Sequence, residues 1–159
     1  MGPSNTPVNN LVLANTEVQI PLPISLNYSS LASVNSSYLG GQLLGTYLAP
    51  TFTSGTPKAM LSVDLPIGVW NLCGRIDVYS SVNITQYIAG ISIFSASPFG
   101  QIVSNGLAGL TSNIVQTSLN TIVRVSSATT YYLNLYLVYS GTLTISNTLP
   151  DSLTATRIA

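Results

Sequence analysis

The chain is 159 residues long, which fits a single domain, and only 5% of its residues are charged, where an average soluble protein has about 25%. Four acidic residues balance four basic ones, histidine is absent, and Cys73 is the one cysteine. Four dispersed cations cannot form the basic surface that nucleic-acid binding needs, and a Ser-His-Asp triad or a zinc site needs histidines or further cysteines. We therefore expect no nucleic-acid partner, metal or other cofactor.

Apolar residues are frequent but interrupted. Hydrophobic residues make up 46% of the chain, which is more than a disordered chain contains. Ser, Thr, Asn and Gly break every apolar stretch well before the roughly 18 residues that a membrane-spanning helix needs. The composition therefore predicts a folded chain without membrane insertion.

The first ten residues contain two prolines and three asparagines and little to bury. We interpret residues 1–10 as an N-terminal arm and residues 11–159 as one domain. Downstream, short alternating segments predict strands at residues 17–20, 43–48 and 61–65, separated by turn signals that contain glycine and proline.

Four longer segments alternate apolar and polar residues with the two-residue period of a strand that has one buried face. Gly74 interrupts the segment that begins at Trp70 and predicts a bulge or a close backbone approach there. Two short strands are expected at residues 143–145 and 153–158. Many strands and little helical periodicity predict an all-β protein, an antiparallel jelly-roll sandwich. The apolar rows are Trp70, Leu72, Ile76 and Val78; Tyr87, Ala89, Ile91 and Ile93; Leu119, Thr121, Val123 and Val125; and Tyr131, Leu133, Leu135, Leu137 and Tyr139.

The last of these segments is apolar on its second face as well, where it carries Tyr132, Tyr136 and Val138. A central strand covered by a loop is one explanation. The explanation that we favour is burial against another copy of the chain, because obligate interfaces are apolar and poor in charge. Such an interface also explains how the chain dispenses with charged side chains on its surface.

Two stretches carry a family resemblance. Residues 53–70 read Thr-Ser-Gly-Thr-Pro-Lys-Ala-Met-Leu-Ser-Val-Asp-Leu-Pro-Ile-Gly-Val-Trp and are followed by Leu72 and Gly74. Residues 127–133 read Ser-Ala-Thr-Thr-Tyr-Tyr-Leu and are followed by Gly141 and the terminal Ala-Thr-Arg-Ile-Ala. From about residue 53 onward, these motifs resemble the C-terminal head domains of bacteriophage tail fibres and related viral fibre or spike proteins. The shared patterns are Leu-Pro-x-Gly-x-Trp, Ala-Thr-Thr-x-Tyr-Leu and a closing strand with a basic residue near its end.

Members of this family are similar to tumour necrosis factor-like jelly rolls and assemble as trimers. The resemblance implies a homotrimer on the virion surface, made in the host cytoplasm, which contacts other virion proteins and attaches to a host-surface protein or glycan. The family often has more charge and a longer fibrous region upstream, whereas only about 50 residues precede the match here. A capsid decoration or minor capsid protein with a purely structural role therefore remains as the alternative.

Several residues receive expected roles on physical grounds. Pro66 and Gly68 fit a tight turn, after which Trp70 can bury its ring while its N–H reaches a carbonyl at the rim. Arg157, near the end of the last strand, can pair with an acid or lie near a symmetry axis. We assign structural or interface roles to Trp70, Tyr132, Tyr136 and Arg157.

Receptor contacts are expected in connections between strands, because loops rich in aromatic, Ser, Asn and Gly residues combine rigid contacts with adaptable hydrogen bonds. The candidate loops are residues 94–101 and 104–109. The candidate binding residues are Phe94, Pro98, Phe99 and Asn105. Subunit contacts or plain loops are the alternative for both segments.

Catalytic chemistry has one candidate. Asp64 and Asp77 flank the turn before Trp70, and a glycosidase needs two carboxyl groups about 5–9.5 Å apart. We favour an ion pair of Asp77 with Arg75 or Arg124 and expect no enzyme. A calcium site would need an Asp-rich loop, which is missing.

Cys73 lies on the opposite face of its strand from Trp70. A free cysteine in such a position is usually a small buried hydrophobe. We therefore expect Cys73 to be buried and unreactive.

Overall fold

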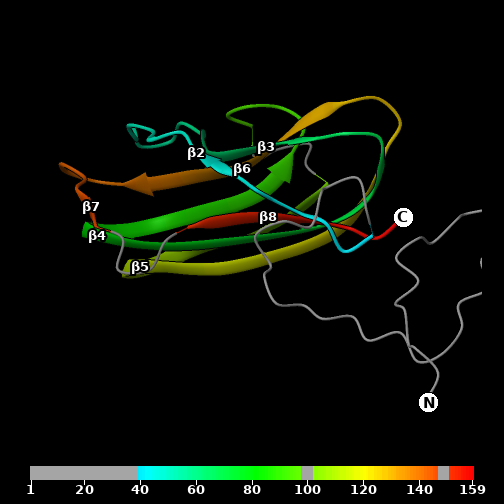
Figure 1. Cartoon of the computed structure of the whole chain (residues 1–159). Coiled ribbons are helices and arrows are strands. Elements are labelled where there is room, and N and C mark those ends of the chain that lie inside the picture. The colour runs from blue at the N-terminus through cyan, green and yellow to red at the C-terminus, as the bar shows by residue number, and fades with distance from the viewer. Residues whose placement is uncertain (1–38, 98–101, 147–150) are drawn as a thin grey trace, which may run out of the picture. The chain divides into compact units, whose positions relative to one another are not determined.

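The computed structural model describes residues 39–97, 102–146 and 151–159 (Figure 1). These residues form an all-β, antiparallel sandwich, and they include no helix. None of their segments is a helix long and apolar enough to cross a membrane. The strands are β1 (Gln42–Leu44), β2 (Thr46–Tyr47), β3 (Lys58–Leu65), β4 (Gly68–Ser92), β5 (Val103–Val125), β6 (Thr129–Tyr139), β7 (Ile145–Ser146) and β8 (Ser152–Arg157).

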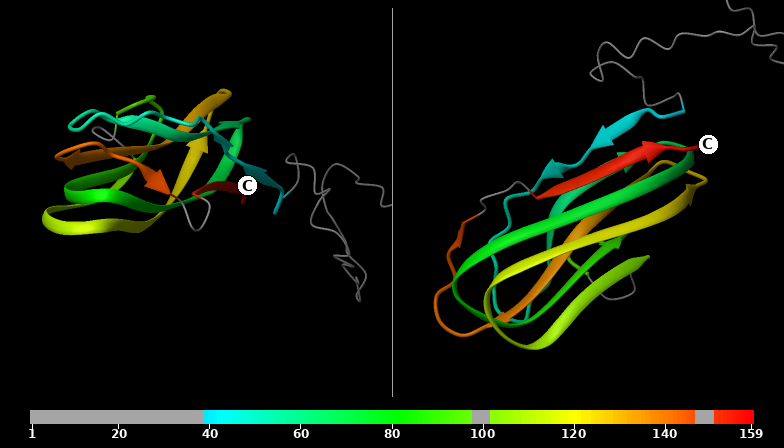
Figure 2. Two further views of the ribbon diagram at one scale, coloured as in Figure 1. Left: turned by 90° about the vertical axis from the view of Figure 1, so that its left-hand side faces the viewer. Right: turned by 90° about the horizontal axis from the view of Figure 1, so that it is seen from below.

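Strand β4 belongs to both layers of the sandwich. Its residues 68–75 pair with β8, while its residues 84–92 pair with β6. Strand β5 follows β4 along nearly its whole length, and the pairing shifts register only between Tyr79 and Gln86. The long β4–β5 ribbon therefore bends at this point and passes from one layer into the other (Figures 1 and 2).

The two layers are named here after their central strands. The β8 layer contains β1, β8, β4 residues 68–79 and β5 residues 114–125, in that order, which the right-hand view of Figure 2 shows in cyan, red, green and yellow. The β6 layer contains β2, β3, β6, β4 residues 84–92 and β5 residues 103–112. Strand β7 pairs with β4 at the bend.

The core lies between the layers and is built from most members of the apolar rows that the sequence predicts. Ile93, the last member of the predicted row that begins at Tyr87, is an exception, because β4 ends at Ser92 and Ile93 is 46% exposed. Trp70 and Leu72 of the β8 layer and Leu133 and Leu135 of the β6 layer are fully buried. Each such side chain contributes about 1.5–3 kcal/mol by leaving water. The period-two interpretation is therefore confirmed for the strands that form the core.

Element boundaries differ from the prediction where a chain segment changes layer. The expected strand at residues 43–48 is divided at Gly45 into β1, which pairs with β8, and β2, which pairs with β3. The separate strands expected around Trp70 and Tyr87 are one continuous strand, β4. Only Ile145 of the segment 143–145 is in a strand. The arm at residues 1–10, the strand at 17–20 and the start of the expected domain at residue 11 lie outside the described residues.

Gly74 allows the two layers to approach closely. Pairing runs without a shift through Gly74 and its neighbour Leu119, so the bulge that we allowed for there is wrong. A methyl group built on Gly74 would lie 2.9 Å from Cδ1 of Leu133, across the core. The close-approach alternative is the one that holds, because Leu133 fills the space where a side chain of residue 74 would lie.

We predict that Gly74→Ala lowers the free energy of unfolding by about 1–3 kcal/mol, the usual effect of overpacking a well-filled core. Urea denaturation measures this change. The double variant Gly74→Ala/Leu133→Val restores space, so its loss should be smaller than the sum of the two single losses. A Gly74→Ala variant as stable as the parent protein would contradict the close contact.

Burial in the core raises the pKa of Tyr131 above its usual value, because a phenolate loses its hydration there. The folded state therefore holds this proton more tightly than the unfolded state does. The contribution of the protonated Tyr131 to the free energy of unfolding is complete below about pH 10, the pKa of tyrosine in the unfolded chain. It is lost as the pH rises through the higher pKa that Tyr131 has in the folded state. Raising the pH from neutral to above about 10 should lower the free energy of unfolding of the parent protein. We predict that the same change of pH lowers the free energy of unfolding of the Tyr131→Phe variant by a smaller amount, which denaturant unfolding measures.

Candidate functional site

Trp70 stands at a corner where the C-terminal end of the chain returns to the β8 layer. Its ring is fully buried, and its Nε1 donates a hydrogen bond to the Pro66 carbonyl at 2.9 Å. Cζ of Arg157 lies 5.7 Å from the ring centroid, within the range of a cation–π contact. Gly68 has φ of +154°, and a methyl group there would lie 3.1 Å from the Ala159 carbonyl oxygen.

This corner matches the structural role expected for the motif Leu-Pro-x-Gly-x-Trp. The burial of Trp70 and the bond from its indole N–H to a rim carbonyl are confirmed. Arg157 interacts within its own chain, over the tryptophan ring. A part for Trp70 or Arg157 in contacts between copies stays a prediction.

Tyr132 and Tyr136 lie on the outer face of the β6 layer and are both half-buried. Between them, Asn134 is fully buried, and its Nδ2 donates to the carbonyl oxygens of Phe94 and Ser97, at 3.1 and 3.3 Å. The loop after β4 therefore covers the middle of this face, as the loop explanation proposed. The tyrosines on either side keep part of their surface open.

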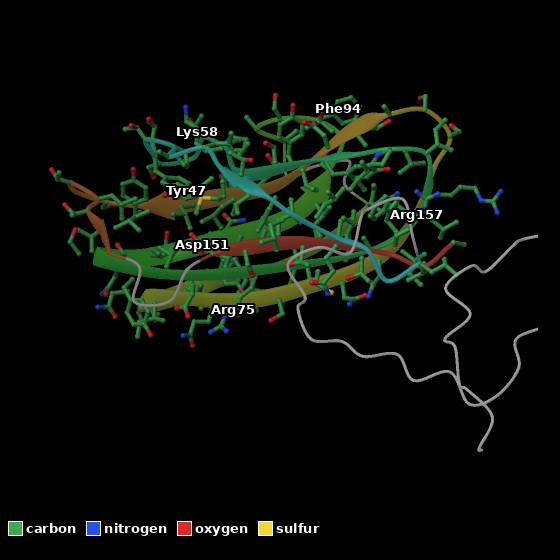
Figure 3. The ribbon with its side chains drawn as sticks, viewed as in Figure 1. Tyr47, Lys58, Arg75, Phe94, Asp151 and Arg157 are labelled. Carbon is green, nitrogen blue, oxygen red and sulfur yellow. The ribbon has the colours of Figure 1, made fainter. Side chains whose placement is uncertain are left out.

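Phe94 lies in that covering loop and is 57% exposed. Its backbone N–H donates to Oγ of Ser92 at 2.8 Å, and its carbonyl accepts the bond from Asn134. These contacts hold the loop against β6 while the ring points outward (Figure 3). The other candidates in this loop, Pro98 and Phe99, lie outside the described residues.

Asn105 is not in a loop, so the interpretation of residues 104–109 as a connection is wrong. These residues belong to β5, and residues 104–108 pair with β4. The small residues that indicated a turn serve close backbone contact instead, since a methyl group on Gly106 would lie 2.7 Å from the Tyr87 carbonyl oxygen. The Asn105 Nδ2 donates to Oγ1 of Thr117 at 2.9 Å, and Asn105 and Phe94 are on different elements of the fold.

Asp64 and Asp77 are separated as well. Their strands do not pair, because β3 lies between β2 and β6 in the β6 layer, whereas Asp77 is in the β8 layer. Asp64 is exposed and accepts a bond from Thr130 Oγ1 at 2.6 Å. The neighbouring carboxylates that a glycosidase reaction needs are therefore not formed by this pair.

Asp77 is instead the centre of a polar cluster on the outer face of the β8 layer. Its carboxylate is fully buried and accepts bonds from Arg75 Nη2 at 3.2 Å and Gln116 Nε2 at 3.0 Å. Its backbone N–H donates to Asp151 Oδ1 at 2.8 Å. The ion pair expected with Arg75 is confirmed, and Figure 3 shows Arg75 and Asp151 on the same side of the ribbon.

Sequence spacing signals only part of this cluster. Arg75 and Asp77 are two residues apart in one strand and so share a face. Gln116 and Asp151 come from distant segments, and only the pairing of β5 and β8 with β4 brings them to the same place.

Cys73 is exposed, which corrects the expectation of a buried thiol. It lies on the outer face of the β8 layer, opposite Asn120 and Thr154 in the neighbouring strands. Its Sγ accepts a bond from Asn120 Nδ2 at 3.0 Å. The prediction that Cys73 lies on the opposite face of β4 from Trp70 is confirmed. Its side chain is nevertheless exposed, because no described segment covers that face at this point.

Exposed apolar side chains are a prominent feature of the surface of the described residues. Three of the large ones are on β5: Leu107, Ile114 and Ile122, which are 55%, 40% and 63% exposed. Ile93 and Ile102 accompany Phe94 near the connection between β4 and β5. The described residues contain no group of three or more His, Cys, Asp or Glu side chains that could hold a metal ion.

One groove of about 530 Å³ lies beside β2 and β7. Tyr47, Phe52, Met60 and Leu143 are among the side chains that line it, and its lining contains no acid, base or cysteine. Such a groove offers contact area, and the lining residues that carry hydroxyl groups are Tyr47, Thr51 and Thr144.

No family model matches this chain, and no curated protein matches it.

We predict that Asp77→Ala lowers the free energy of unfolding by about 1–3 kcal/mol, because it removes a buried carboxylate that accepts charge-assisted hydrogen bonds from Arg75 and Gln116. Arg75→Ala should cost less than about 1 kcal/mol, since the Arg75 side chain is 50% exposed and water replaces its interactions. Urea denaturation of both variants tests the order. Equal losses would show that the ion pair, rather than the burial of Asp77, determines the energy.

Proposed function

We propose that this chain is a non-enzymatic viral structural protein, the homotrimeric jelly-roll head of a tail fibre or spike that attaches to its host by non-covalent receptor binding. One observation carries the proposal. The fold exposes large apolar side chains, among them Phe94 and Ile122, in a chain with only 5% charged residues. A protein with this surface is expected to bury part of it against other molecules.

The order of the strands supports the jelly-roll part of the proposal. Along the chain, β1 is in the β8 layer, β2 and β3 are in the β6 layer, β4 and β5 each contribute to both, β6 returns to the β6 layer and β8 to the β8 layer. A chain that crosses repeatedly between two antiparallel layers in this way is typical of Greek-key sandwiches, of which the jelly roll is one.

Scarcity of charge supports self-association. A small soluble monomer normally carries a mixed-charge surface, whereas here Asp77, one of four acids, is buried. Burial of exposed apolar side chains against neighbouring copies would replace the missing charged groups as the source of solubility. The family resemblance of the motifs around Trp70 and Tyr131 implies that three copies associate.

The loop that carries Phe94 supports a receptor-binding role. Its backbone is anchored by Ser92 and Asn134, so the exposed ring is presented without a large loss of conformational entropy on binding. The separation of Asp64 from Asp77 supports binding rather than glycan cleavage.

The second candidate is a capsid decoration or minor capsid protein without a receptor. It is favoured by Asn105, a predicted binding residue whose side chain donates a hydrogen bond to Thr117 of the same chain. In this version, the exposed apolar residues would contact only other virion proteins.

Light scattering at low protein concentration tests the assembly, and the expected mass is a multiple of three chains. A stable monomer would contradict the proposal.

For attachment, we predict that Phe94→Ala weakens binding of the labelled protein to susceptible bacterial cells by at least about tenfold, the usual effect of removing a central aromatic contact. The matched control is Ile67→Ala, which removes a similarly exposed side chain on a different turn.

Both variants should keep the mass and unfolding midpoint of the parent protein. If the parent protein binds no cells from a broad bacterial panel, while particles that lack it are less stable, the structural alternative is correct. If the Phe94 and Ile67 variants bind cells equally well, Phe94 is not part of the receptor-binding site.

A further inference from the structure

Strand β5 ends both layers of the sandwich on the same flank. It has 23 residues and pairs with β4, and no other described strand pairs with it. Figure 2 shows it as the outer strand of the ribbon on that side. One edge of β5 therefore presents a long row of backbone N–H and C=O groups without a strand partner in the described part of the chain.

The other edges of the sandwich are short. Strand β1, at the opposite end of the β8 layer, has three residues, and β2, at the opposite end of the β6 layer, has two. Short edge strands, prolines and lysines are the usual devices that prevent sheets from pairing with each other. Strand β5 contains no proline, lysine or acidic residue, and Arg124 is its one charged residue. Its edge therefore lacks the features that discourage pairing.

The same flank is incompletely closed. Leu107 lies opposite the buried Tyr87 and so faces the inside of the sandwich, but it is 55% exposed. Asn105, two residues earlier on the same face, is also exposed, and it bridges the layers through its bond to Thr117. An inward-facing leucine that stays in contact with water indicates surface that another molecule would bury.

We propose that the β5 edges of two copies of this chain pair with each other in antiparallel fashion, so that the sheets continue from one copy into the next. An antiparallel pair of identical strands is an isologous contact, in which each copy supplies the same surface. Arg124 lies one residue from the end of β5, so the two arginines lie at opposite ends of such a pair and do not repel each other. The backbone groups of each edge then satisfy those of the other.

The flank is large enough for a stable contact. The part of β5 in the β8 layer, residues 114–125, extends for about 40 Å at a rise of about 3.4 Å per residue. Two layers about 10 Å apart, with their side chains, make the flank about 20 Å wide. The product, about 800 Å² per copy, is the area that each partner contributes to an interface of standard size.

This pairing is two-fold and goes beyond the proposed trimer, so the two ideas predict different masses. If both hold, the assembly has six chains. Pairing without the trimer makes a dimer, and the trimer without pairing has three chains. A monomer would contradict both.

The test is light scattering on the parent protein and on Ser104→Lys/Asn120→Lys. Both residues are exposed on β5, Ser104 in the β6 layer and Asn120 in the β8 layer. The substitutions place lysines along the edge that would pair with the same edge of a second copy, where their like charges oppose pairing. We expect the parent protein to have the mass of six chains or of two chains. We expect the variant to have half of that mass. The matched control, Gln42→Lys/Thr56→Lys, adds the same charge at exposed positions outside β5 and should keep the parent mass.

Amide hydrogen exchange supplies a second measurement. In the parent protein, the β5 amides whose N–H groups point away from β4 should exchange at least about tenfold more slowly than in the edge variant, because only these amides gain a partner on pairing. Amides of the buried β6 strand should exchange equally in both proteins. A parent mass of one or three chains, an edge variant with the parent mass, or equal exchange of the outward-pointing β5 amides would each overturn the pairing.

Discussion

The fold depends on the pairing of β4 with β5 on both sides of the bend between Tyr79 and Gln86. Because these two strands belong to both layers, the position of the bend determines how the layers face each other. β8 then adds to one half of β4 and β6 to the other half. The core forms where the two halves face each other, and the fit of Leu133 against Gly74 is one consequence of that spacing.

Several of the few charged groups in the described part of the chain make contacts with other groups of the same chain. Asp77 is buried under Arg75, Gln116 and Asp151, and Arg157 lies over the ring of Trp70. Each of these interactions orders a corner of the β8 layer, and the burial of Asp77 also removes one charge from the solvent-facing surface. The exposed surface of the described residues consists mainly of neutral polar and apolar groups, which is the property on which the proposed association rests.

Predictions from the sequence succeeded where one local property decided the outcome. The alternation from Tyr131 to Leu137 indicated a strand with a buried face, and these side chains are in the core. The position of Trp70 after a Pro-x-Gly turn indicated its burial and its carbonyl partner. Predictions failed where neighbours decided. Asn105 lies among small residues that indicate a turn, but pairing with β4 overrides that preference, and Cys73 is exposed because no described segment covers its side of the sheet.

By itself, the sequence determined the all-β class, most of the core rows, the corner at Trp70 and the scarcity of surface charge. These follow from composition and from periodicities of two residues, which are local properties of the chain. Only the tertiary structure decided that Asp64 and Asp77 are in different layers, that Gln116 and Asp151 meet at Asp77, and that β5 forms an open flank. Those facts depend on which strands become neighbours, and strand pairing joins residues whose separation in sequence carries no local signal.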